Sequence, residues 1–372
     1  MTGDGLRIAL LAPPWFPVPP PAYGGIEAVV ALLADGLADA GHAVTLFASG
    51  DSSTRAELCA VYDQAPSEHI GSSLWELRHA AAYLERAGEF DVLHDHTGLV
   101  GLLVSAFAPG AAVHTVHGPV GGEPGELYAA VCRRHPHARL ISISRNQQRR
   151  RPDLPWLANV PNAVDVESYP LGAAKEGYLL FLGRMSPEKG CHLAIEVARA
   201  AGLPLRIAGK KREPLEEAYF DRFVRPCLGG GVEYLGEVSE AEKRDLLAGA
   251  LATLFTIDWE EPFGLVMIES MACGTPVLAT RRGSVPEVVE DGVTGFVADD
   301  YRDLAAFVDR AAALDPREIR GRAAARFSPG RLVEEHVAAY RLALELGPAA
   351  GRPRPGAAGR DVLEGAAEGS SA

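Results

Sequence analysis

Short apolar runs alternate with stretches of helical periodicity along most of the chain. The runs are typical of strands buried on both faces, and they fall at residues 7–12, 43–48, 91–96, 112–116, 140–144, 178–183, 205–208, 252–256 and 276–280. Apolar residues at helical spacing occupy positions 29, 30, 33 and 37, and further amphipathic helices are predicted at 301–314 and 331–346. This alternation predicts an α/β fold with mainly parallel sheets.

The length of the chain predicts two domains. At 372 residues it exceeds the usual single core. We expect a first domain at residues 1–170, with a linker that begins near 161, and a second domain at 171–330. A helix at 331–347 would follow. The tail at 348–372, rich in Ala, Gly, Pro and Ser, is expected to be disordered.

Composition excludes several classes of protein. Hydrophobic residues make up 47% of the chain and charged residues 23%, as in soluble globular proteins. The net charge of −13 argues against nucleic acid as the main partner, because phosphate contacts need a basic surface. No run approaches the ~18 apolar residues of a spanning helix, and no signal peptide is recognised at the N-terminus. Five scattered cysteines without CxxC spacing indicate reduced thiols in a cytoplasmic protein.

The stretch from Glu261 to Glu269 carries the strongest candidate chemistry. Glu261 precedes a proline and is therefore expected to be extended, while Gly264 allows close approach to the backbone. Residues 265–271 read as a short apolar helix that ends at Gly274. Free N–H groups at the helix start would bind phosphate. A carboxylate beside such a helix end suits a sugar linked to a diphosphate, with Glu261 on sugar hydroxyls and Glu269 on others, such as those of a ribose.

Two cations follow the predicted strand at 178–183. Arg184 offers a bidentate fork and Lys189 a point charge, a suitable pair for a diphosphate. Each alone is more often a surface charge. The segment lacks the GxxxxGK[ST] pattern of a Walker A loop.

Glycines and histidines in the first half also follow predicted strands. Gly24 and Gly25 lie between a strand and a helix, so they form either a ligand loop or a simple turn; GxGxxG is absent. His96 and His117 end neighbouring strands and are expected to converge on one edge of a cleft. His117 is the better functional candidate, although lone histidines are more often structural.

Residues 133–151 contain seven arginines and no acidic residue. One interpretation is a solvated helix face next to a strand. The other is an electropositive surface for an anionic acceptor, or for weak contact with a membrane surface. Later in the chain, Ser239 and Glu242 have the spacing of a capping box.

Several segments together carry a family resemblance. They are Y-G-G-I-E (23–27), D-V-L-H-D-H (91–96), T-V-H-G (115–118), P-N-A-V-D (161–165), G-R-M-S-P-E-K-G (183–190), L-G-E-V-S (235–239), E-P-F-G-L-V-M-I-E (261–269) and G-S-V-P-E-V-V (283–289). In this order they resemble the family 4 glycosyltransferases, retaining enzymes with the GT-B fold of two facing Rossmann-like domains and an interdomain cleft. The E-x7-E stretch is the most specific segment. Ala163 departs from the glycine that is common in the family.

The resemblance implies roles for the matching positions. Arg184 and Lys189 would bind the donor diphosphate and stabilise the leaving group. Glu261 would hold hydroxyls of the transferred sugar, and Glu269 would bind the ribose. The other positions are the backbone N–H groups of Phe263, Gly264 and Leu265 beside the donor, the segment around Val238 at the base, Gly24 and Gly25 in a loop over the diphosphate, and His117 near the donor sugar and acceptor.

The implied reaction moves a hexosyl group from a UDP- or GDP-sugar to a hydroxyl, with retention of configuration. The acceptor, which is a glycan, a lipid or a small molecule, would bind the N-terminal domain. No cofactor is expected beyond the donor substrate. No metal is expected either, because D-x-D is absent and the cations would stabilise the diphosphate.

Other activities stay open at this point. A glycoside hydrolase would use Glu261 and Glu269 as its carboxylate pair, but it would not need the phosphate-binding features. A nucleotide-sugar epimerase or a glycan phosphorylase can share the fold. A catalytically silent module that binds sugar nucleotides is a further alternative.

Overall fold

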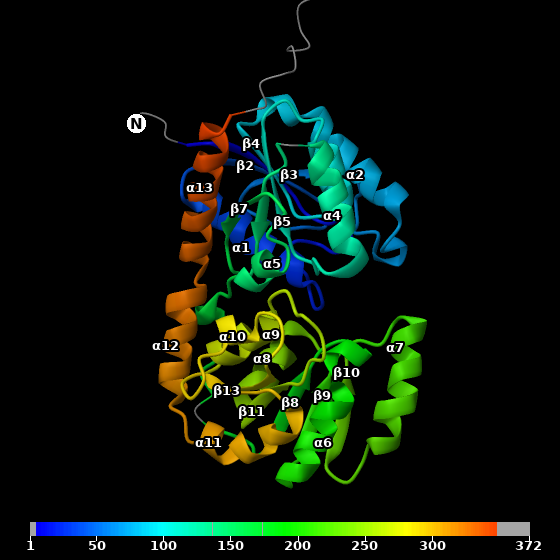
Figure 1. Ribbon diagram of the computed structural model, residues 1–372, viewed down its shortest axis with the longest axis vertical. Helices are drawn as coiled ribbons and strands as arrows, with labels where there is room; N and C mark the ends of the chain where they lie inside the picture. The colour runs from blue at the N-terminus through cyan, green and yellow to red at the C-terminus, as the bar shows by residue number, and fades with distance from the viewer. Residues whose placement is uncertain (1–4, 136, 173, 348–372) are drawn as a thin grey trace, which may run out of the picture.

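The computed structural model describes residues 5–135, 137–172 and 174–347, which form two parallel sheets covered by helices (Figure 1). The first sheet contains β1 (Arg7–Leu11), β2 (Ala43–Ala48), β3 (Glu57–Ala60), β4 (Val92–Asp95), β5 (Ala111–Val116), β6 (Leu140–Ser142) and β7 (Trp156–Asn159). The second contains β8 (Leu179–Leu182), β9 (Leu205–Ala208), β10 (Val232–Gly236), β11 (Ala252–Phe255), β12 (Val277–Thr280) and β13 (Gly295–Ala298). The predicted α/β class is confirmed.

The α-helices lie between these strands and after them. They are α1 (Gly25–Asp39), α2 (Ser73–Glu85), α3 (Leu99–Ser105), α4 (Gly122–Arg134), α5 (Arg145–Arg150), α6 (Cys191–Ala201), α7 (Pro214–Tyr219), α8 (Glu240–Gly249), α9 (Leu265–Ala272), α10 (Val285–Val288), α11 (Val308–Ala312), α12 (Pro316–Phe327) and α13 (Pro329–Glu345). Because helices cover both faces, central strands such as β8 are buried along their whole length.

The strand order places a switch point in each sheet. The first sheet has the order β3-β2-β1-β4-β5-β6-β7 and the second β10-β9-β8-β11-β12-β13. The order therefore reverses between β1 and β4, and again between β8 and β11. Ligands of such sheets bind beyond the carboxyl ends of the strands at these points. The loops that follow β1, β8 and β11 carry the candidate residues Gly24, Arg184 and Glu261.

The chain crosses between the two sheets twice, and the two crossings are bonded to each other. Val164 N–H donates to Phe327 O at 2.9 Å, and Arg331 donates to the carbonyls of Pro161 at 2.6 Å and Asn162 at 3.1 Å. From Val164 onward the first crossing packs into the core of the second sheet, with Tyr169 buried there. The predicted division at residue 170 stays a prediction, and the predicted tail at 348–372 lies outside the described residues.

Helix α12 packs against α9 in the second half of the molecule, and α13, which follows it in the chain, packs against the first sheet. Figure 1 shows the two helices in succession along one side of the molecule. Val333 on α13 lies so close to Gly36 on α1 that a Cβ there would be 2.6 Å from Val333 Cγ2. The glycine allows the two helices to approach.

One predicted helix differs from the structure. Residues 301–314 begin as a 3-10 helix, η7 (Tyr301–Phe307), and continue as α11. In a 3-10 helix, residues three apart align on one face. That turn directs Leu304 and Phe307 toward β13, where Phe307 stacks on Phe296 with ring centroids 5.1 Å apart.

Helices long and apolar enough to cross a membrane are absent from the described part of the chain.

Candidate functional site

The loop after β8 is fixed against the end of β11. Gly190 has a positive φ of 71°, and a Cβ at this position would lie 1.8 Å from the carbonyl oxygen of Thr256. Thr256 Oγ1 donates to Gly190 O at 2.8 Å. A glycine is required at this contact, and the contact brings Lys189 to the loop that carries Glu261.

Lys189 and Glu261 form an ion pair at the centre of the site. Lys189 Nζ donates to Glu261 Oε2 and lies 4.9 Å from the centroid of the Trp259 ring. Trp259 Nε1 donates to the same oxygen at 3.0 Å. Both bonds fall on Oε2, and no bond from the described residues reaches Oε1. The buried carboxylate is thus oriented by two donors and keeps one oxygen available.

Glu269 is held in the same way further along α9. Lys243 on α8 donates to its Oε1 at 2.8 Å, and the Tyr169 hydroxyl donates to that oxygen at 3.1 Å. Within the described residues Oε2 again receives no bond. Burial lowers the pKa of Lys243, but the charges of Glu269 and Glu240 outweigh it and raise this pKa overall.

The loop before α8 lies next to this carboxylate network. The predicted capping box is confirmed: Ser239 N–H donates to Glu242 Oε2 at 2.8 Å, and Glu242 N–H donates to Ser239 Oγ at 3.3 Å. Val238 precedes the cap and packs against the core that contains α9.

Arg184 faces the glycine loop of the first half. It donates to Glu188 at 3.2 Å at a half-exposed position. Burial raises the pKa of the Tyr23 phenol, and the charge of Arg184 lowers it in part. Lys210 lies 4.3 Å from the centroid of the Tyr23 ring. Tyr23 therefore meets cations of the opposite sheet.

The two helix starts also meet at this point. A Cβ on Gly25 would be 2.9 Å from Leu265 Cδ1, so the first residue of α1 lies against the first residue of α9. Gly264 has a φ of 79° before α9, and a Cβ there would lie 2.7 Å from Phe255 Cζ, so this position favours glycine.

The histidines that end β4 and β5 converge as predicted. His96 Nδ1 and His117 Nε2 are 2.8 Å apart. His96 Nε2 is buried without a partner in the described residues. A buried N–H without a hydrogen-bond partner is rarer than a buried acceptor without one. We therefore place the proton of His96 on Nδ1, from which it donates to His117. His117 then carries its own proton on Nδ1, and burial lowers its pKa to about 3, so the ring is neutral near pH 7.

A buried carboxyl lies beneath the glycine loop. Glu27, in the first turn of α1, is buried, and a Cβ on Gly24 would lie 3.1 Å from its Oε2. Burial raises the pKa of Glu27 to about 7, although its own backbone N–H opposes this shift.

This raised pKa predicts a pH-dependent stability. A carboxyl whose pKa is raised on folding stabilises the fold below about pH 4.5, and that contribution is lost as pH rises through 7. Glu27→Gln should remove the dependence. The unfolding free energy of the variant minus that of the wild type should therefore increase by up to about 3 kcal/mol from pH 5 to pH 8. Urea denaturation of both proteins at the two pH values measures this difference. Equal pH profiles for the two proteins would contradict the prediction.

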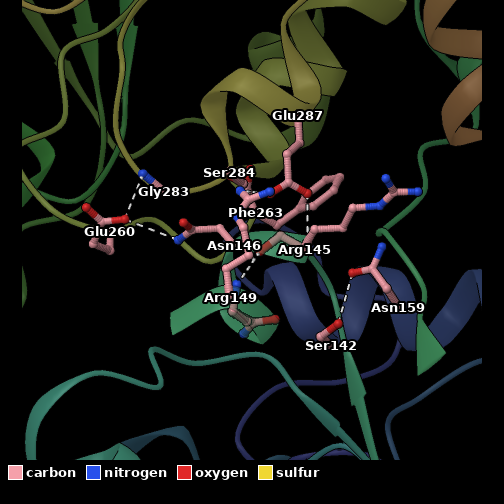
Figure 2. Close-up of polar contacts among 12 residues, drawn as sticks. Ser142, Arg145, Asn146, Arg149, Asn159, Glu260, Phe263, Gly283, Ser284 and Glu287 are labelled. Carbon is pink, nitrogen blue, oxygen red and sulfur yellow. Dashed lines mark hydrogen bonds and ion pairs between the residues drawn. The ribbon is translucent and has the colours of Figure 1, made fainter. Parts of the chain in front are cut away.

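A cavity of about 220 Å³ opens beside the Glu261 loop, between the two sheets. It is lined by Pro119, Val120, Gly121, Gly122, Asn146, Gln147, Arg150, Trp259, Glu260 and Pro262. Its charged lining consists of Arg150 and Glu260, which lie 3.6 Å apart. Figure 2 shows how α5 reaches this loop from the first sheet.

The structure brings most of the predicted residues to facing loops. Lys189 contacts Glu261, and Arg184 faces the loop of Gly24 and Gly25. His117 belongs to the first sheet, and its ring bonds to His96. Sequence reasoning missed Trp259, Lys243, Tyr169 and Tyr23. For Trp259 a signal existed, because an aromatic residue directly precedes the acidic pair.

No group of three or more His, Cys, Asp or Glu side chains within residues 5–135, 137–172 and 174–347 is placed to hold a metal ion.

Comparisons with known proteins find relatives over most of the chain. The family model described as "Glycosyltransferase Family 4" matches residues 23–167, and that described as "Glycosyl transferases group 1" matches residues 170–323. AviGT4, a glycosyltransferase involved in avilamycin A biosynthesis, is 31% identical with a TM-score of 0.71, over 91% of this chain and 98% of its own.

More distant relatives cover similar lengths. The phosphatidyl-myo-inositol mannosyltransferase of Mycolicibacterium smegmatis is 29% identical over 81% of this chain and 83% of its own. The crystal structure of Anabaena HepE in complex with UDP and glucose has a TM-score of 0.70 at 20% identity, covering 90% of this chain and 98% of that one; at this identity it shows the fold alone.

Two facing parallel sheets, matched along nearly their whole length by these models and structures, identify the chain as a member of the family 4 glycosyltransferases with the GT-B fold.

Proposed function

We propose that this glycosyltransferase moves a hexosyl group from a nucleoside diphosphate sugar to an acceptor hydroxyl, with retention of configuration and without a metal. One observation carries the proposal. Glu261 and Glu269, on one loop and helix, are each held through one carboxylate oxygen and keep the other available. Two oriented acceptors beside Lys189 suit a ligand with hydroxyls at both ends and negative charge in the middle.

Donor binding would rearrange the central ion pair. Lys189 bonds to Glu261 in the structure. A diphosphate would attract Lys189, and Glu261 would then accept bonds from sugar hydroxyls. Arg184 and the N–H groups at the start of α9, around Phe263 to Leu265, would take the rest of the diphosphate charge. The base of the donor stays open between uracil and guanine, so a UDP-sugar and a GDP-sugar are both tested below.

The remaining site residues would orient the sugar and the base. Glu269 would accept bonds from the ribose through Oε2, and the backbone near Val238 would lie at the base. His117 is neutral, so it would donate a hydrogen bond from Nδ1 to a sugar hydroxyl rather than supply charge. As charge develops on the leaving diphosphate, the fixed cations would stabilise it.

The cavity beside Trp259 is our candidate for the acceptor site. Its lining carries one cation and one anion, together with the Asn146 and Gln147 amides and the Trp259 ring. A balanced charge with an aromatic surface favours a neutral polyhydroxylated acceptor. The name of the mycolicibacterial relative refers to phosphatidyl-myo-inositol, so free inositol, inositol phosphate and the lipid form useful comparisons.

Incubation with radiolabelled UDP-glucose and GDP-mannose and these acceptors tests the proposal. We expect a new glycosidic bond whose anomeric configuration, measured by NMR, matches that of the donor, and unchanged yield in EDTA. An epimerised donor, a phosphorylated sugar or nucleotide binding without turnover would instead support the alternative activities. An inverted product would contradict the retaining mechanism.

A further inference from the structure

Helix α5 of the first sheet holds the residue that precedes Glu261. Asn146 Nδ2 donates to Glu260 Oε2 at 3.1 Å, and Gly283 N–H donates to the same oxygen at 3.1 Å (Figure 2). Asn146 and Glu260 lie on opposite sides of the cleft. One carboxylate oxygen therefore connects α5, the Glu261 loop and the loop before α10.

The loop before α10 is tightly packed against the Glu261 loop. Ser284 N–H donates to Glu261 O at 3.0 Å, and Ser284 Oγ donates to Phe263 O at 2.7 Å. A Cβ on Gly283 would lie 2.3 Å from the Glu261 carbonyl oxygen. Movement of this loop therefore transfers directly to the backbone of Glu261.

A second attachment from α5 reaches α10, which directly follows this loop, through Glu287. Arg145 N–H donates to Glu287 Oε2 at 2.7 Å, and Arg149 donates to Oε1 at 2.9 Å (Figure 2). The Glu287 side chain is 21% exposed and that of Arg149 62%. Both carboxylate oxygens are thus occupied by donors from the opposite sheet.

We infer that Asn146 and Arg149 are positioning residues, which couple closure of the two sheets to the placement of Glu261. Neither is assigned a contact with the donor, and Arg149 does not line the candidate acceptor cavity either. When the sheets separate, Glu260 loses its bond to Asn146 and Glu287 loses both of its bonds, so the loop is fully held only in the closed arrangement. The role in turnover rests on the proposed function; the coupling itself does not.

Reversal of one ion pair tests the coupling. Arg149→Glu and Glu287→Arg should each raise hydrogen exchange in peptides spanning 259–264 and 283–287 about tenfold, because like charges then face each other at a partly exposed site. The kcat with UDP-glucose or GDP-mannose should fall by a similar factor. Binding of UDP or GDP should change less than threefold, since the nucleotide contacts lie elsewhere.

The double variant Arg149→Glu/Glu287→Arg provides the rescue. It should recover most of the exchange protection and kcat, although the bond from Arg145 N–H stays lost. Arg225→Glu serves as the matched control, because Arg225 is 59% exposed and pairs with Asp221 within its own domain; it should behave as the wild type. Asn146→Ala should raise exchange in 259–264 as well.

Two results would overturn the inference: single variants that exchange like Arg225→Glu, or a double variant that is no better than either single. If the wild type turns over neither donor, the proposed function fails, and the exchange data alone then decide whether α5 holds the loop.

Discussion

Replacement of Arg184 by alanine should lower kcat/KM for the nucleotide sugar on the order of 10²–10³-fold, as for the loss of one donor to a developing oxyanion. The side chain belongs to a half-exposed pair with Glu188, so its removal should cost little stability. Steady-state kinetics and a thermal melt of the same preparation would separate the two effects.

Two variants sharpen this test. Glu188→Ala removes the partner but keeps the cation, and its kcat/KM should stay within about threefold of the wild type because the pair is partly exposed. Arg184→Lys keeps the charge but lacks the bidentate fork, so its kcat/KM should lie between those of the wild type and Arg184→Ala. Full activity of Arg184→Ala would show that the Arg184 charge does not take part in catalysis.

The second large effect concerns stability. Asp95 and His114 form a buried hydrogen bond between β4 and β5, and Asp95 Oδ1 also accepts two bonds from Thr97 at 2.8 Å. Asp95→Ala should lower the unfolding free energy by about 3–5 kcal/mol, because buried His114 and both donors of Thr97 lose their charged acceptor. Urea denaturation followed by tryptophan fluorescence measures the loss.

The surface pair of Arg7 and Asp91 provides the control, with side chains 57% and 32% exposed. Asp91→Ala should cost no more than about 1 kcal/mol. Similar losses for Asp91→Ala and Asp95→Ala would show that burial does not decide the strength of these pairs.

Local signals explain why the centre of the site was predictable. The apolar run after Gly264 and the glycine at 274 predict a short helix at 265–271, and the structure has this helix as α9. The strands that line the site are buried on both faces, and their apolar runs show in the sequence. Family membership and fold are likewise confirmed, whereas retention, metal independence and cytoplasmic location stay predictions.

Contacts between distant segments were not predictable. Lys243 reaches Glu269 from another helix, and Asn146 reaches Glu260 from 114 positions away; no periodicity encodes such pairs. The edge strands β3 and β7 were also missed, because they are short and only partly buried. The sequence did not decide whether the arginine-rich residues 133–151 bind an anionic partner or form a solvated helix face. In the structure Arg149 and Arg150 face Glu287 and Glu260, which favours contact within the protein, while weak contact with a membrane surface stays a prediction.

The paired crossings near Val164 and Ser328 restrict how the enzyme can open. A single connecting segment would let the two halves rotate freely, whereas two segments bonded to each other define one hinge axis. The two halves should then open by rotation about this axis, with the smallest displacement near the crossings and the largest on the side farthest from them. Cleavage of only one connection would release that constraint without detaching either half.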